Sequence, residues 1–141
     1  ALWFGGGLAI GYGGGNNIRV SDCEFVSCVA GNGGGIVVAT DIVGVHMQRL
    51  TISNCVAFLT GGAGLGIGQR VENVLVESST IQDCTSIGLG TVGGGAVVES
   101  GNSHITFREV MFARNYAVSG AALFAVSDNE YLSIVGCTFI Q

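Results

Sequence analysis

The chain has 141 residues, the length of one ordinary domain or of a segment from a longer protein. Apolar residues make up 48% of it and charged residues only 11%, with 25 glycines and no proline. The aliphatic content argues against intrinsic disorder, and the net charge of −5 provides no basic surface for nucleic acid. No stretch approaches the roughly 18 consecutive apolar residues of a membrane-spanning helix. We therefore expect neither nucleic-acid binding nor a membrane span.

A repeated pair of segments runs through the whole chain. In each repeat, a Gly-rich segment is followed by one that alternates apolar and polar residues and ends in a large apolar anchor residue. In chain order the pairs are 5–10 with 16–25, 33–38 with 43–52, 62–67 with 71–81, 93–98 with 103–112, and 120–125 with 130–139. The anchors are Phe25, Ile52, Ile81, Phe112 and Phe139, which lie 27, 29, 31 and 27 residues apart.

Apolar residues occupy the same offsets in every repeat. They stand two, five and seven residues before the anchor, and at two alternate positions of the Gly-rich segment. With the anchor, this makes six positions in each of five repeats, and Ser79 is the only polar residue among them. Alternation over short runs bounded by Gly, Asn, Asp and Ser is typical of β-strands, and no ten-residue stretch follows the helical period.

Short strands that recur about every 28 residues predict a parallel β-helix. We expect an all-β fold of about five coils of 27–31 residues, with three short strands per coil, a right-handed course and a spacing of about 4.8 Å between coils. Residues 1–141 then form a single β-helix segment. Because an open coil end exposes unpaired backbone and apolar core, we expect this segment to be an excerpt of a longer solenoid.

Four of the five arginines share a repeat position with an acid one coil earlier. The expected pairs are Asp22 with Arg49, Asp41 with Arg70, Glu77 with Arg108, and Asp83 with Arg114. Exposed pairs of this kind contribute only about 0–1 kcal/mol each. Their importance here is that they would favour one register between coils over a slipped one.

Cysteines form a column three residues after the anchors. Cys28, Cys55 and Cys84 occupy this position in the first three repeats, and Asn115 occupies it in the fourth. The sequence allows two interpretations: reduced thiols that pack as small hydrophobic side chains, or one bridge, either Cys28–Cys55 or Cys55–Cys84. The column lacks the tetrahedral arrangement that a structural metal site needs, so we expect no metal and no cofactor.

The outward positions of the Gly-rich segments form a nearly uncharged surface. Its large apolar members are Val37, Val97, Phe124 and Val126. A flat apolar β-surface usually marks a contact, so these four residues are the candidate partner-contact face. The expected partner is another segment or subunit of a larger assembly. The alternative is a tolerated small-residue surface, or one that loops of the same chain cover.

Two segments resemble a known repeat family. FARN at 112–115, followed by YAVSGAAL, and FVSC at 25–28, followed by VAGNGGGIVV, resemble the FxxN and GGA[ILV] repeats of chlamydial polymorphic membrane proteins. Similar repeats occur in extracellular right-handed parallel β-helix proteins of protists and algae. The chain departs from the pattern where Cys replaces three of four Asn residues. The resemblance implies an autotransporter-like adhesin passenger, extracellular or at the cell surface, in contact with cell surfaces or glycans.

Polysaccharide lyases and hydrolases of the pectate-lyase-like fold are the other large group of right-handed β-helices. Those that hydrolyse need clustered acids on one strand face, whereas the ten acids here are scattered along the chain. We therefore expect no catalysis in this segment and a structural role, as a rigid rod in a large extracellular or cell-surface filament or adhesin. The alternative is a fragment of a polysaccharide lyase or hydrolase whose active site lies in other coils.

Overall fold

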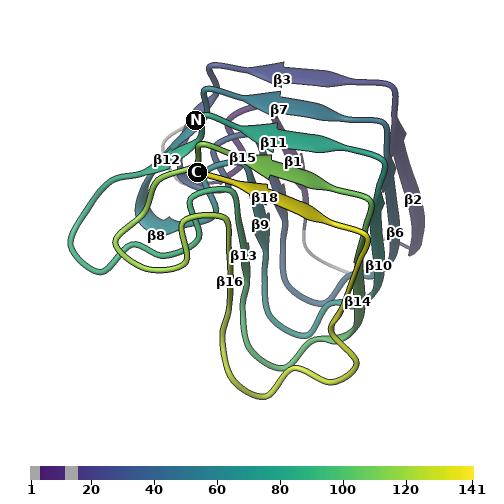
Figure 1. The fold of residues 1–141 in the computed structure, drawn as a ribbon. Helices are drawn as coiled ribbons and strands as arrows, with labels where there is room; N and C mark the ends of the chain where they lie inside the picture. Colours follow the sequence, from purple (N-terminus) through teal and green to yellow (C-terminus); the bar gives the residue numbers. More distant parts are fainter. Residues whose placement is uncertain (1–3, 12–15) are drawn as a thin grey trace.

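The computed structural model describes residues 4–11 and 16–141, and every regular element in these ranges is a β-strand. The strands form four parallel sheets stacked along one axis, so the chain is a β-solenoid (Figure 1). Three of the sheets contain one strand from each of five coils, as the repeat predicts. The fourth sheet is short and contains strands from three coils.

The glycine-rich sheet contains the strands that follow the Gly-rich turns. They are β1 (Leu8–Ile10), β5 (Ile36–Val38), β9 (Leu65–Ile67), β13 (Ala96–Val98) and β16 (Leu123–Ala125). The long-strand sheet follows it in each coil. Its strands are β2 (Asn16–Ser21), β6 (Val43–Gln48), β10 (Glu72–Glu77), β14 (Ser103–Arg108) and β17 (Ser133–Val135).

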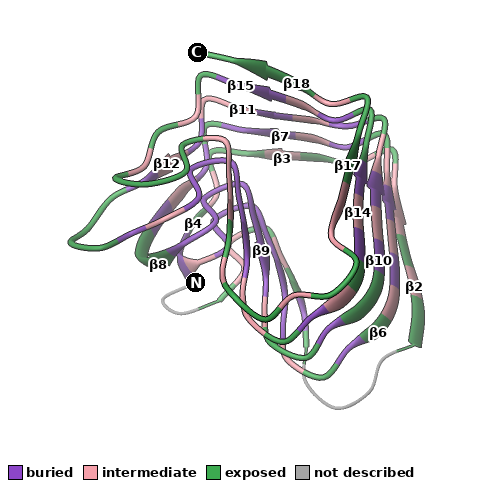
Figure 2. Ribbon diagram, turned by 60° about the horizontal axis from the view of Figure 1, so that its bottom comes forward, coloured by how far each residue is buried: buried purple, intermediate pink, exposed green. Residues whose placement is uncertain are grey.

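The anchor sheet contains the anchor residue of every coil. Its strands are β3 (Glu24–Val26), β7 (Thr51–Ser53), β11 (Thr80–Gln82), β15 (Met111–Ala113) and β18 (Thr138–Ile140). The arm sheet is the element that the repeat did not reveal. Its strands are β4 (Val29–Asn32), β8 (Val56–Gly61) and β12 (Thr85–Ser86). Together with the loops that follow them, they project to one side of the stack (Figures 1 and 2).

The predicted register between coils is confirmed. The anchors Phe25, Ile52, Ile81, Phe112 and Phe139 are successive Cα partners in the anchor sheet. The inward residues of the glycine-rich sheet pair in the same way, for example Ile36 with Leu65. Slipping one strand by a single residue would turn its apolar residues outward, so the core itself enforces this register.

One apolar core runs along the axis between the sheets. In the middle coils its side chains are almost completely covered, among them Met47, Ile52, Leu65 and Phe107. Figure 2 shows buried positions recurring along the strands of these coils. Ser79, the one polar inward residue, accepts a hydrogen bond from the Leu50 N–H at 3.0 Å and donates one to the Glu77 carbonyl at 2.7 Å. Its hydroxyl is therefore satisfied inside the core, as a buried polar group must be.

The corners between sheets are built from left-handed residues that are not all glycine. Between the long-strand and anchor sheets, the φ angles of Asp22, Arg49, Ser78 and Glu109 lie between 47° and 55°. This conformation is costly for residues with a side chain. Here it is held by the stack, because the N–H of each corner residue donates to a carbonyl of the next coil, such as Arg49 to Glu77 at 3.2 Å.

Candidate functional site

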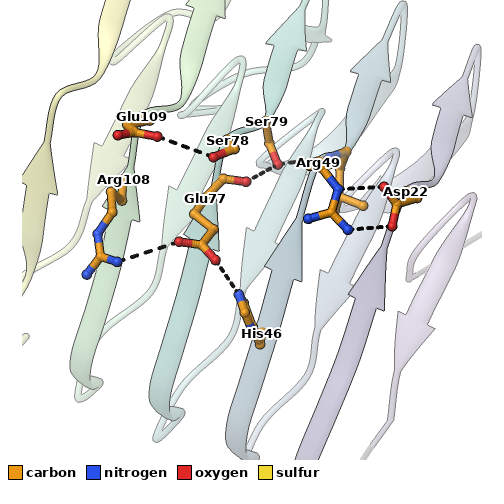
Figure 3. Close-up of polar contacts among 9 residues, drawn as sticks. Asp22, His46, Arg49, Glu77, Ser78, Ser79, Arg108 and Glu109 are labelled. Carbon is orange, nitrogen blue, oxygen red and sulfur yellow. Dashed lines mark hydrogen bonds and ion pairs between the residues drawn. The ribbon is translucent and has the colours of Figure 1, made fainter.

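Polar side chains gather on the outer surface of the long-strand sheet and at its corner with the anchor sheet (Figure 3). The centre of this group is Glu77, whose carboxylate lies between side chains from the neighbouring coils. Its Oε1 lies 2.7 Å from His46 Nε2, and its Oε2 lies 3.6 Å from Arg108 Nη1. With Glu77 ionised, His46 donates from Nε2, which leaves Nδ1 as the acceptor of the neutral ring.

This arrangement brings an acid and a base together without completing a hydrolytic pair. A glycoside hydrolase needs two carboxyl groups flanking the bond that is cleaved. In the sheet, the two residues directly beside Glu77 are Gln48 and Arg108, not a second acid. The His46–Glu77–Arg108 group therefore forms a ladder of polar side chains that contact one another across three coils.

All four predicted acid–arginine pairs are present. Besides Glu77 with Arg108, three of them lie at corners and are bidentate. Arg49 to Asp22 spans 2.6 Å in both bonds, Arg114 to Asp83 spans 2.7 Å in both, and Arg70 to Asp41 spans 2.7 and 3.0 Å. In each corner pair, hydrogen bonding to the guanidinium lowers the pKa of the aspartate below its ordinary value. The fifth arginine, Arg19, stands beside His46 in the sheet.

The structure places Cys28, Cys55 and Cys84 at equivalent positions of consecutive coils, all as free thiols. Cys55 and Cys84 are buried, and Cys28 is partly covered. Hydrogen bonding with the Cys84 thiol lowers the pKa of Cys55 to about 7, whereas the same bond raises the pKa of Cys84, and burial raises that of Cys28. The column packs against the Gly-rich turns, where a Cβ on Gly35 would lie 3.4 Å from Cys55 Sγ.

Asn115 ends the cysteine column and bonds differently. Its Oδ1 accepts from the Cys84 N–H at 3.0 Å, and its Nδ2 donates to the Ile81 carbonyl at 2.9 Å, so it ties two backbone groups of the preceding coil. The thiols of Cys55 and Cys84 instead contact carbonyls two residues earlier, at 3.3 and 3.2 Å. Each thiol also lies near the anchor carbonyl of the preceding coil, Cys55 Sγ 3.6 Å from that of Phe25 and Cys84 Sγ 3.9 Å from that of Ile52. Asn115 thus adds a bond to a backbone N–H and shortens the contact with the anchor carbonyl, whereas the thiols add a local contact.

The candidate partner-contact face is only partly accessible. Val37 and Val97 face outward from the glycine-rich sheet, yet they are 5% and 3% exposed. The chain itself covers them: a Cβ on Gly33 would lie 2.8 Å from the Val37 Cβ, and one on Gly62 would lie 2.7 Å from Val97 Cγ1. Phe124 and Val126 are partly exposed. A contact through these four residues stays a prediction, and Phe124 and Val126 offer the accessible part of it.

A groove of about 400 Å³ lies on the same side, between the glycine-rich sheet and the arm. Val37, Gly66 and Val97 contribute to its lining, as do the polar side chains of Asn32 and Glu99. Asn32 Oδ1 accepts two hydrogen bonds from Thr60, at 3.2 Å from its N–H and 2.6 Å from its hydroxyl. Burial raises the pKa of Glu99, and no cationic side chain pairs with it among the residues that the structure describes.

Several exposed apolar side chains lie on the arm. Phe58, Leu59, Ile87, Leu89 and Val118 are all exposed there. The sequence contains one signal for this surface, which is a set of large apolar residues that lie outside the six inward positions of the repeat. These residues have the wrong offsets for the core and so must face outward or be covered by a partner.

Residues 4–11 and 16–141 contain neither a metal-binding cluster nor a membrane-spanning helix. No three His, Cys, Asp or Glu side chains in these ranges are placed to hold a metal ion together. Nor do these ranges contain a helix that is long and apolar enough to cross a membrane.

Comparison with known proteins identifies a family model that the chain matches. A family model described as a right-handed beta helix region matches residues 3–139, almost the whole chain. No curated protein and no solved structure was found to match. The family match supports the parallel β-helix and its handedness. It does not support the narrower resemblance to the chlamydial repeats.

Proposed function

Because the chain belongs to the right-handed β-helix family, we propose that it is a structural module, a rigid solenoid segment in a large extracellular or cell-surface assembly such as a filament or adhesin. The observation that carries the proposal is the unbroken register of the stack. Each coil pairs with the next through three or four sheets, with no shift in the glycine-rich, long-strand or anchor sheets. Among the described residues, a shift in the register between coils lies in the arm sheet, between Ala30 and Asn32.

Further features make the stack stiff. Ion pairs link successive coils at three corners and on the long-strand sheet. Buried side chains of successive coils stack along the axis, and such cores resist deformation because they are close-packed. A segment of this kind transmits position and force, which suits a spacer that holds contact surfaces apart.

Backbone ¹⁵N relaxation of the 141-residue chain tests the rigidity on which the proposal rests. We expect order parameters of about 0.85 throughout the strands of the middle coils, β5 to β13, with lower values confined to the arm loops. A spacer role is contradicted if whole coils show order parameters below about 0.6, because a flexing stack cannot set a distance.

A polysaccharide lyase or hydrolase fragment is the second candidate function, and the ladder around Glu77 is the feature that favours it. An acid held 2.7 Å from an imidazole could move a proton if a glycan lay across this sheet. The test is release of reducing ends or unsaturated products from neutral and acidic polysaccharides. Turnover that is lost in Glu77→Gln and kept in Glu109→Gln would establish the enzyme and reject the purely structural role.

A further inference from the structure

One flank of the solenoid has almost no charge. The segments 26–40, 54–69, 84–98 and 115–127 contain no Asp, Glu, Arg or Lys. In each coil these segments run from the end of the anchor strand, through the arm, to the end of the glycine-rich strand. The charges are concentrated on the long-strand and anchor sheets and at their corners, and Glu99 is the one that borders the groove.

The arm carries an apolar strip on this flank. Its first column runs parallel to the solenoid axis through residues that pair between coils, Val29, Val56, Thr85 and Tyr116. Two residues further along the chain stand Phe58, Ile87 and Val118, one in each of three successive coils and all exposed, which we take together as the second column. Ile87 is 49% and Val118 is 67% exposed, and at the tip of the adjacent loop Leu89 is fully exposed. We call these two columns the arm strip.

We propose that the arm strip packs against the arm strip of a second copy of this chain, so that two solenoids associate side by side. The proposal rests on the structural role proposed above and names the surface and the partner. A two-fold arrangement is the natural one, because one patch then supplies both halves of the contact.

Two observations favour a second copy of this chain as the partner of the arm strip. Its apolar side chains recur with the coil spacing of about 4.8 Å, and a second solenoid carries side chains at that same spacing. The molecule has a net charge of −5, so two copies repel one another wherever their charged faces meet. The arm is the place where copies can approach without burying a charge.

Sedimentation velocity of the 141-residue chain over a wide concentration range tests the proposal. We expect a reversible monomer–dimer equilibrium for the wild type. Ile87→Lys and Val118→Lys should each weaken dimerisation by about tenfold or more, because each places a charge in the contact. Raising the salt concentration should strengthen the dimer, since it screens the net charge while the apolar contact stays.

Val43→Lys is the matched control for Val118→Lys. Val43 lies on β6 in the long-strand sheet and is 39% exposed, so the same substitution is made at an exposed valine away from the arm. Its dimerisation should equal that of the wild type. Far-ultraviolet circular dichroism of each variant shows whether the solenoid is intact.

Four outcomes overturn the proposal. The first is a wild type that stays monomeric at all concentrations, and the second is a wild type that binds phosphatidylcholine vesicles instead of a second copy. The third is dimerisation that persists in both arm variants. The fourth is dimerisation that is lost in Phe124→Glu and kept in Ile87→Lys, which would place the contact on the glycine-rich face. A failure here is separable from a failure of the spacer role, because order parameters measured on the monomer do not depend on dimerisation.

Discussion

Glycines two residues apart meet very different surroundings in the third coil. A Cβ on Gly64 would lie 2.5 Å from the Gly95 carbonyl oxygen and 2.5 Å from Ile81 Cγ2, so the next coil leaves no room for it. A Cβ on Gly66 would have its nearest neighbours at 3.5 Å, which is ordinary contact. The Gly-rich turns therefore set the approach of successive coils, whereas a glycine within the strand that follows can be replaced.

Gly64→Ala should destabilise the fold by about 1–3 kcal/mol, because the added methyl group must push two coils apart. Gly66→Ala should be neutral or stabilising by up to about 1 kcal/mol, because alanine loses less backbone entropy on folding. Urea unfolding followed by circular dichroism compares the two variants with the wild type. Equal free energies of unfolding for the two variants would show that coil spacing is not limited at Gly64.

Glu99 is a charge in a place that disfavours it. Burial raises its pKa above the ordinary 4.5, so the folded state binds its proton more tightly than the unfolded state does. The ionised form then opposes folding above its raised pKa, and this cost disappears as the pH falls below 4.5.

Glu99→Gln should accordingly raise the urea midpoint at pH 7, with the difference from the wild type vanishing in acid. Glu24→Gln, at an exposed carboxylate on β3, is the control and should leave the midpoint unchanged. A Glu99→Gln midpoint below that of the wild type at neutral pH would mean that the carboxylate has a stabilising partner.

At the scale of elements, the corner residues of successive coils interact with one another along the stack, so a corner is not an isolated turn. The paired aspartates Asp22, Asp41 and Asp83 all have lowered pKa values because each hydrogen-bonds to an arginine of the next coil. An acid with a lowered pKa stabilises the fold above its ordinary value of 3.8, and that contribution is lost as the pH falls through the lowered pKa.

Replacing all three aspartates with asparagine should therefore make the free energy of unfolding fall less steeply as the pH drops below 3.8. Urea midpoints measured at several pH values give the slope for each protein. Because the pairs are exposed, added salt should reduce the difference between variant and wild type at neutral pH. Parallel pH profiles would contradict the assignment of acid sensitivity to the corners.

The inward side chains of each element explain why some elements could be predicted from the sequence and others could not. Side chains at fixed offsets report on the core, so the three main sheets and the four ion pairs could be predicted. The arm strands β4, β8 and β12 bury only small residues such as Ala30, Ala57 and Ser86, which leave no period of large apolar residues. The burial of Val37 and Val97 was equally hidden, because left-handed glycines fold the backbone over them.

For the whole molecule, the stack predicts that one complete coil can be removed. Deleting residues 53–81 joins Ile52 to Gln82, and Gln82 is the register partner of Ser53, so every remaining residue keeps its inward or outward direction. The shortened chain should fold with β-rich circular dichroism and lower stability, as expected where each coil contacts only its neighbours.

Deleting residues 53–66 is the matched control for the coil deletion. It removes about half a coil and joins a residue of the anchor sheet directly to one of the glycine-rich sheet. Residues of one sheet would then have to occupy positions of the other, so that chain should not fold. If both deletions unfold the protein, the coils are not interchangeable units. If both fold, the register is weaker than the core implies.

The loop between β12 and β13 has a practical consequence. Leu89 is fully exposed between Gly88 and Gly90, and nothing lies within 4 Å of a Cβ built on Gly90. The chain nevertheless returns to its place, since Val92 bridges Gly61 on one side and Ser119 on the other. A foreign peptide grafted in place of Leu89 would be displayed on a stiff support whose neighbouring coils already fix both ends of the insertion.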